Sequence, residues 1–286
     1  MTRAAIIIPH FEDLARLRRC LAALDQPGRE AVEVIVVDNG SRQPLTEVAA
    51  EFPAVRVVIE TAKGAAATRN RGVRETTAPR LWFLDADCVP APDWIATALR
   101  LADSADIVGG DVDLFDETPG PRSGAAAFEA VFAFRVRRYV ERVGFAVTAN
   151  MLTHRRVFEA VGPFAPGLSE DKDWGLRARA AGFRLAFAPG LRVAHPARPD
   201  WPALLGKWRR LTREGFALQG TGAAARARWA IRALALPPSA LVDAPKVLVS
   251  PRLAGPAERL AALRVLFRLR GLRFVWMLRQ ALGGPV

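Results

Sequence analysis

Short apolar runs alternate with segments of helical pattern through the first part of the chain, and this alternation most restricts the possible folds. Strands are expected at 4–9, 32–38, 55–60, 80–87 and 105–115. Between them, leucines at helical spacing predict a helix over 11–24, and a glycine-started run predicts another over 64–76. Strand, helix, strand in this order implies parallel pairing with right-handed crossovers. We therefore predict an α/β fold with a mostly parallel central sheet flanked by helices.

Polar side chains gather where these predicted strands end, at His10, Asp38, Asn39, Glu60, Asp85 and Asp87. In open α/β sheets, ligands bind outside the carboxyl ends of the strands. The carboxyl edge of the sheet is thus the expected position of a functional site.

Two carboxylates, Asp85 and Asp87, stand two residues apart at the end of the fourth strand. In an extended backbone both side chains project to one face, where they repel each other unless a cation lies near. Magnesium commonly takes one or two carboxylates and completes its coordination with water and phosphate oxygens. The pair therefore predicts half of a metal site that a diphosphate completes. The alternative is that it only caps a turn.

Two further segments are consistent with a nucleotide ligand. Asp38 could accept hydrogen bonds from a ribose hydroxyl or a base N–H, or form an Asx turn before Gly40. The helix expected at 64–76 offers small residues and a positive amino end, followed by Arg69, Asn70 and Arg71. An ordinary alanine-rich packing helix is the competing interpretation.

The positive charge is confined to the end of the chain. The net charge is +12, and residues 201–286 hold 15 of the 41 basic residues but only 3 of the 29 acidic ones. Residues 1–200 are therefore neutral overall, with 26 of each. This asymmetry indicates a neutral working domain and a basic appendage suited to an anionic surface, although frequent arginine at helical surface positions is an alternative.

The basic segment, residues 200–286, has a helical pattern. Over 258–282, one predicted face is apolar: Leu260, Leu263, Phe267, Phe274, Met277 and Leu278. A basic amphipathic helix of this kind can lie in a membrane interface, or its apolar face can pack on the catalytic domain. Both interpretations are open from the sequence.

Location is suggested by what the sequence lacks. No segment resembles a signal peptide, and no apolar run approaches the roughly 20 residues that span a bilayer. Cys20 and Cys88 give no disulfide framework. We expect a cytoplasmic protein, with the inner face of the plasma membrane as a further expectation.

An ordered set of motifs resembles inverting glycosyltransferases of family 2, which have the GT-A-type fold. The motifs are IIIPHFED, VIVVDNGS, KGAAATRNRGV, FLDADC and TANMLTHRRVFEAVGPFAPGLSEDKDWGLRARAAGFRL, and the resemblance covers about residues 4–198. It implies a nucleotide-diphosphate sugar donor, Mg²⁺ or Mn²⁺, and a glycan or lipid-linked glycan acceptor. It also implies a catalytic domain at 1–199, divided into a nucleotide-binding half (1–115) and an acceptor half (116–199), before the extension at 200–286.

The resemblance carries residue roles with it. The resemblance assigns donor binding to Pro9, Phe11, Glu12, Asp38, Asn70, Arg71, Asp85, Ala86 and Asn150. It assigns contact with the metal or the diphosphate to Asp85, Asp87 and His195, and it implies that Asp87 is the more direct metal ligand. His10 departs from the family, whose members often carry a small hydroxyl residue there, and the sequence offers no role for it.

The general base implied by the resemblance is the aspartate of Glu170–Asp171. Inversion at an anomeric carbon needs a base that deprotonates the acceptor hydroxyl, and Asp171 matches the family's position. Asp173 competes for the role. All three acids could instead favour the amino end of the helix predicted at 169–182, through its dipole.

Three functions are weighed against one another. The preferred one is metal-dependent inverting transfer of a single sugar, in envelope or extracellular glycan synthesis. The segment KWRRL at 207–211 lacks the glutamine that polymerising family members carry. A sugar-1-phosphate nucleotidyltransferase is disfavoured because PHFED is acidic and lacks glycine. A basic nucleic-acid-binding protein fits the charge of the extension, but no recognisable motif supports it, and specific nucleic-acid binding is not expected.

Overall fold

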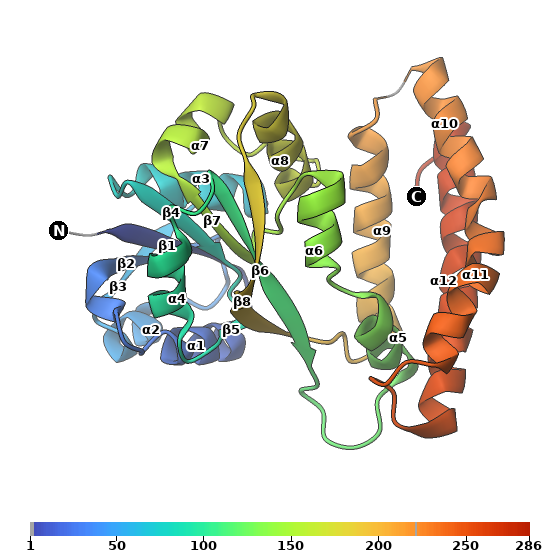
Figure 1. Ribbon diagram of the computed structural model, residues 1–286, viewed down its shortest axis with the longest axis horizontal. Helices are drawn as coiled ribbons and strands as arrows, with labels where there is room; N and C mark the ends of the chain where they lie inside the picture. The colour runs from blue at the N-terminus through green and yellow to red at the C-terminus, as the bar shows by residue number, and fades with distance from the viewer. Residues whose placement is uncertain (1–2, 221) are drawn as a thin grey trace. The chain divides into compact units, whose positions relative to one another are not determined.

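The computed structural model describes residues 3–220 and 222–286, which form two compact units (Figure 1). The first unit contains the chain up to Asp113 together with Phe134–His195, and the second contains Leu114–Ala133 together with Pro196–Val286. Residues 116–133, expected within the acceptor half, thus belong to the second compact unit. The functional division at residues 115 and 199 stays a prediction.

The first unit is built on one sheet of eight strands in the order β3-β2-β1-β4-β7-β6-β8-β5. The strands are β1 Ala4–His10, β2 Val32–Asp38, β3 Val55–Ile59, β4 Arg80–Leu84, β5 Val89–Pro90, β6 Ile107–Phe115, β7 Asn150–His154 and β8 Leu185–Pro196. Strands β1 to β4 pair in parallel, as predicted. Strand β7 is antiparallel to both β4 and β6, and β5 is antiparallel to β8.

The sheet is therefore mixed rather than mostly parallel. Parallel pairing follows where a helix carries the chain back across the sheet between two strands, as it does from β1 to β4. Between β6 and β7 the chain instead passes through the second unit. The strand β7 then enters the sheet in the opposite direction.

Helices of the first unit accompany this sheet: α1 Leu14–Ala23, α2 Thr46–Glu51, α3 Ala65–Arg74, α4 Trp94–Leu101, α6 Val136–Arg138, α7 Arg155–Val161 and α8 Glu170–Ala180. A short 3₁₀ turn covers Arg29–Ala31. Helix α1 begins after Asp13, whose side chain accepts a hydrogen bond from the Arg16 amide. The core is apolar and aromatic, with Trp82, Phe83 and Trp94 fully buried.

Strand β4 is shorter than predicted, and this changes the geometry of the aspartate pair. It ends at Leu84, and Asp85 starts a turn that the Cys88 amide closes with a 3.0 Å hydrogen bond to the Asp85 carbonyl. The chain must turn here to enter β5, which pairs with β8. The prediction that an extended backbone aims Asp85 and Asp87 at one face is therefore wrong.

The sequence of residues 123–143 has the pattern of one continuous helix, but the structure interrupts it. Helix α5, Gly124–Phe132, belongs to the second unit, and α6 and a π-helical turn at Tyr139–Val143 belong to the first. The break lies at Ala133–Arg135, where Phe134 has a φ of 46°. Apolar periodicity continues across the break, so the pattern alone did not reveal it.

The second unit is helical, as predicted for the basic extension: besides α5 it has α9 Trp201–Ala217, α10 Ala223–Leu234, α11 Leu236–Leu248 and α12 Gly255–Ala281 (Figure 1). Helix α12 contacts each of the other four. Of the apolar face predicted over 258–282, Leu260 and Phe267 are exposed whereas Met277 is buried, so only part of that face packs within the unit. Because α12 is packed on several sides, its buried residues do not form one stripe.

Arginines of α12 also pack on tryptophans of α9. The Arg268 guanidinium lies 4.2 Å from the centre of the Trp201 ring, and that of Arg273 lies 4.3 Å from Trp208. Lys207 of the KWRRL segment donates a 2.6 Å hydrogen bond to the buried Glu129. Among the described residues, no helix combines the length and apolar character that crossing a bilayer requires.

Candidate active site

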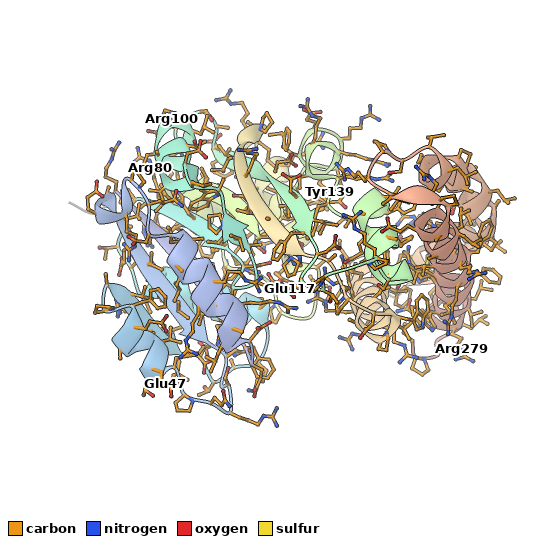
Figure 2. The ribbon with its side chains drawn as sticks, turned by 90° about the horizontal axis from the view of Figure 1, so that it is seen from below. Glu47, Arg80, Arg100, Glu117, Tyr139 and Arg279 are labelled. Atoms are coloured by element: carbon orange, nitrogen blue, oxygen red, sulfur yellow. The ribbon has the colours of Figure 1, made fainter. Side chains whose placement is uncertain are left out.

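Most of the predicted site residues lie at or just after the carboxyl ends of β1, β2 and β4, and the others come from α3, β7, α8 and β8. Because these strands are neighbours and parallel, their last residues meet at one edge, with His10 in register with Asp38 and Asp38 with Ile59. Figure 2 shows this polarity: Arg80, which begins β4, and Glu47, on α2 beyond the end of β2, lie at opposite ends of the unit. Three groups of side chains follow along this edge.

The first group is centred on Asp38. Its Oδ1 accepts hydrogen bonds from His10 Nδ1 at 3.0 Å and from the Ser41 hydroxyl at 2.6 Å, and its Oδ2 accepts from the Ser41 amide at 3.0 Å. The Asp13 amide donates to His10 Nε2, which leaves the ring proton on Nδ1. Burial alone would raise the pKa of Asp38, but these bonds outweigh it and hold the pKa below its ordinary value. Asp38 is therefore a fixed carboxylate.

The loop after β1 lies against this group. The Glu12 amide donates to Ser41 Oγ, and Glu12 Oε1 accepts from the Arg42 amide at 2.9 Å, which lowers the pKa of Glu12. Glu12 has a φ of 56°, in the left-handed region. Phe11, beside the half-buried Pro9, is 56% exposed, with Lys63 Nζ 5.2 Å above its ring. An aromatic ring held outward in this way offers a face for stacking.

A cavity of about 650 Å³ opens beside Asp38. Its lining includes the Asp38 and Ser41 side chains at the end of β2, apolar residues Val57 and Ile59 of β3, and Arg71 of α3. The Arg71 side chain is also held by Glu75, one helical turn away, at 2.6 Å. A cavity of this volume with apolar walls and a few fixed polar groups fits a small organic ligand such as a nucleoside.

The second group is organised by Arg69, which sequence reasoning did not assign. This buried guanidinium donates to Asp85 Oδ1 at 2.5 Å and to Glu170 Oε1 at 2.8 Å. Burial disfavours its charge, but the two carboxylates outweigh that effect and raise its pKa above the ordinary value. Arg69 thus ties the start of the aspartate turn to the first residue of α8, where Asp171 lies.

Removal of this tie should destabilise the protein. Arg69→Met leaves Asp85 and Glu170 without their shared cation, and we expect the free energy of unfolding to fall by about 3 kcal/mol. Urea denaturation at neutral pH measures it. Arg71→Met is the matched control, two residues along the same helix, and should change stability little because Glu75 keeps its ion pair with Arg56. Equal stability of the two variants would contradict the role of Arg69.

The third group joins Asp87 to His195. Asp87 Oδ2 lies 3.1 Å from His195 Nε2, and the buried imidazole packs against the Phe134 ring with centroids 4.9 Å apart. A carboxylate oxygen and an imidazole nitrogen at this separation fit two neighbouring ligands of one divalent cation, with its other coordination positions open to further oxygens. Within the described residues, no cluster of three or more His, Cys, Asp or Glu side chains could hold a metal alone. The pair thus fits a cation completed by a diphosphate, whereas the Asp85 carboxylate is bonded to Arg69.

Asp171 has the properties that a general base needs. Its Oδ1 accepts hydrogen bonds from the Lys172 amide at 2.7 Å and from the Ser169 hydroxyl at 3.3 Å, and no described residue is hydrogen-bonded to its Oδ2. Burial, and after it the negative charge of Glu170, raises the pKa of Asp171 to about 6. The competing Asp173 instead accepts a 2.9 Å hydrogen bond from Arg177. The geometry favours Asp171.

Two predicted ligand contacts are instead occupied by internal hydrogen bonds. The Asn70 amide binds the backbone of Phe164 twice, as donor and as acceptor at 2.9 Å each. Asn150 is fully buried; its Oδ1 accepts from Trp94, and its Nδ2 donates to the Asp111 and Leu191 carbonyls. Both side chains thus position loops around the site, and their predicted role in donor binding stays a prediction. Ala86, also buried, offers only its backbone to a ligand.

Gly110 explains how Asn150 reaches its partners. A Cβ at Gly110 would lie 2.2 Å from Asn150 Nδ2 and 2.5 Å from the Leu191 carbonyl oxygen. The glycine is therefore needed for close packing of β6, β7 and β8. Trp174 likewise is a packing residue, fully buried, with its indole N–H bonded to the Gly162 carbonyl.

The comparisons with known proteins agree with this geometry. Residues 5–162 match the sequence profile of Glycosyl transferase family 2. The glycosyltransferase AglE of Haloferax volcanii is 32% identical over 208 residues, which cover 68% of this chain and 67% of AglE. A pre-mycofactocin glycosyltransferase of Mycobacterium tuberculosis is 28% identical over 69% of this chain but only 44% of its own length.

Solved structures support the fold. The mannosyltransferase PcManGT of Pyrobaculum calidifontis, in complex with GDP-Man and Mn²⁺, superimposes with a TM-score of 0.59 at 20% identity, covering 96% of this chain and 87% of that one. S. aureus TarS gives a TM-score of 0.52 at 14% identity over 98% of this chain and 54% of its own. The predicted GT-A-type fold is thereby confirmed.

Proposed function

The chain belongs to glycosyl transferase family 2, and from this premise we propose that it is a metal-dependent inverting enzyme that moves one sugar from a nucleotide-diphosphate donor to a hydroxyl acceptor. The observation that carries the proposal is the pair of hydrogen bonds by which Arg69 joins Asp85 to Glu170, the neighbour of Asp171 in the chain. It links the turn that would face a diphosphate to the residue that would act on the acceptor.

The nucleoside of the donor is assigned to the cavity beside Asp38. A carboxylate kept ionised by His10 and Ser41 can accept hydrogen bonds from a ribose hydroxyl or a base N–H. The exposed ring of Phe11 offers a stacking face, and Arg71 offers positive charge toward the phosphates. Glu12 and its Arg42 partner hold the loop that carries Phe11.

The diphosphate is assigned to the space in front of Asp87 and His195. These two side chains would hold Mg²⁺ or Mn²⁺, which, when bound, supplies positive charge that stabilises the departing nucleoside diphosphate. PcManGT was solved with GDP-Man and Mn²⁺, which supports a divalent cation and a nucleotide sugar as the class of ligands. Asp85, held by Arg69, would position the turn.

Asp171 is proposed as the base. Its Oδ2 would accept the proton of the acceptor hydroxyl, whose oxygen attacks the anomeric carbon from the face opposite the leaving diphosphate. This in-line displacement inverts the configuration at that carbon. With a pKa of about 6, Asp171 is ionised at neutral pH yet basic enough to take the proton as the new bond forms.

The acceptor is proposed to be a glycan or a lipid-linked glycan of the cell envelope. The basic second unit would bring the enzyme to an anionic membrane surface, at the inner face of the plasma membrane. Transfer of single sugars rather than polymerisation is proposed, because Lys207 and Trp208 of the KWRRL segment are used in packing.

The proposed donor class is tested by thermal shift with UDP-, GDP-, CDP- and dTDP-sugars, each with Mn²⁺ or with EDTA. One donor should raise the melting temperature by several degrees, and only with Mn²⁺, because the cation and diphosphate complete each other's coordination. Inorganic pyrophosphate with Mn²⁺ is the control for binding without base recognition. Stabilisation by every donor, equally with EDTA, would contradict the metal-dependent function.

A further inference from the structure

A row of apolar side chains is exposed along α10 and α11. The two helices follow each other with only Ala235 between them, and the row recurs every three or four residues, as one face of a helix does. It consists of Ile231, Leu234, Ala235, Pro238, Leu241, Val242, Pro245, Leu248 and Val249, and we call it the α10–α11 stripe.

The exposure of the stripe is large. Ile231 is 65% exposed, Leu241 66%, Val242 71% and Val249 78%. The helices already have a buried apolar face on the opposite side, at Trp229, Ala233, Leu236, Ala240 and Val247. The stripe is therefore a second apolar face that packing within the unit does not use. Contiguous exposed apolar surface of this kind marks an interaction site more often than chance exposure.

Basic side chains are exposed on the two helices that carry the stripe, and acidic side chains are rare there. Arg228, Arg232 and Lys246 are exposed on the same two helices. The single acid of these helices, Asp243, has its carboxylate bonded to Lys246 and Arg270. Residues 201–286 carry a net charge of +12, so the field around the stripe is positive.

We propose that the α10–α11 stripe docks on an anionic lipid bilayer, with its apolar side chains in the interface and the neighbouring cations against the headgroups. A helix with one apolar face and flanking basic residues is the pattern of an interfacial anchor. The proposal deepens the membrane role given under the proposed function. It assigns that role to residues 231–249, whereas the sequence pattern alone had suggested residues 258–282.

Charge decides between a bilayer and a second copy of this chain as the occupant. Two stripes paired across a two-fold axis would bring the cations of both copies close together, with one already paired acid per copy to offset them. An anionic bilayer supplies the opposite charge over the whole face. The mixture of apolar side chains and cations therefore favours lipid.

Vesicle flotation with the full-length protein tests the proposal. Vesicles of phosphatidylcholine with 30% phosphatidylglycerol should bind the protein, and pure phosphatidylcholine much less. The variant Leu241→Asp/Val249→Asp should lose at least tenfold in partitioning to the anionic vesicles. Because both side chains are exposed, it should fold normally, which circular dichroism checks. The matched control Phe267→Asp, an exposed apolar residue of α12 outside the stripe, should change partitioning less than twofold.

A second pair of measurements separates lipid docking from other outcomes. Arg228→Gln/Arg232→Gln should weaken binding to anionic vesicles about fivefold per cation removed. Sugar transfer to a soluble acceptor should be unchanged in the stripe variant, so failure of docking and failure of the proposed function are distinguishable. Unchanged vesicle binding of Leu241→Asp/Val249→Asp, or a wild-type dimer that this variant dissociates without any vesicle binding, would overturn the proposal.

Discussion

Replacement of Asp171 by asparagine should lower the rate of sugar transfer by roughly 10²- to 10⁴-fold while the donor still binds. The amide is nearly isosteric with the carboxylate and can keep its hydrogen bond from the Lys172 amide, so the start of α8 should be preserved. What it loses is the ability to take the proton from the acceptor hydroxyl. Single-turnover transfer assays with the donor identified by thermal shift measure the effect.

The pH profile gives an independent readout of the same group. Folding raises the pKa of Asp171 to about 6, so the wild-type rate should fall tenfold per pH unit below that value as the carboxylate takes up a proton, and should level off above it. The residual rate of Asp171→Asn should lack this step. A descending acid limb in the variant with the same midpoint would assign the titration to another residue.

Asp173→Asn is the matched control for the base. It lies two residues further along α8 and accepts from Arg177, so its replacement should leave the rate within a fewfold of wild type. Its free energy of unfolding should fall slightly because Arg177 loses this partner. If Asp173→Asn abolished transfer and Asp171→Asn did not, Asp173 rather than Asp171 would be the general base.

The sequence predicted which residues lie at the site better than it predicted which side chains they are hydrogen-bonded to. Strand ends can be read from apolar runs, so the residues at the carboxyl edge, Asp38 and Asp85 among them, were found. The partners of these residues were not, because a hydrogen bond between His10 and Asp38 joins positions 28 residues apart and leaves no local pattern. Arg69 is the clearest case: it lies within a quoted motif, yet only the folded chain brings Asp85 and Glu170 to it.

Two errors have the same physical origin. The apolar pattern of a sequence indicates which residues are buried but not where the backbone changes direction. It therefore predicted that β4 continues through Asp87, although the chain turns at Asp85. For the same reason the pattern of α5 and α6 reads as one helix, although the backbone breaks at Phe134. In the second unit, the sequence left open whether the apolar face of 258–282 packs or binds a membrane, and the structure shows α12 in contact with four other helices. The exposed stripe on α10 and α11 has a clear spacing in the sequence, but only the structure shows that this face, and not the opposite one, is exposed.

Asp87→Ala should abolish the Mn²⁺-dependent stabilisation by the donor and lower transfer at least about 100-fold. Asp87 Oδ2 and His195 Nε2 lie 3.1 Å apart, and without the carboxylate only the imidazole of this pair remains to hold the cation. Thermal shift with and without Mn²⁺ measures binding, and transfer assays over a range of Mn²⁺ concentrations measure whether excess metal restores activity.

Comparison with two other aspartates shows whether the effect is specific. Asp103→Ala removes an exposed carboxylate that pairs with Arg80 at the start of β4, away from the site, and should leave the donor response intact. Asp85→Ala should reduce the response and also lower the melting temperature without ligand, because Arg69 then keeps only Glu170. Asp87→Ala should lower the ligand-free melting temperature less than Asp85→Ala does, because the buried Arg69 keeps both of its carboxylate partners. A normal donor response of Asp87→Ala together with a lost response of Asp85→Ala would make Asp85 the metal ligand and would require Arg69 to release it when donor binds.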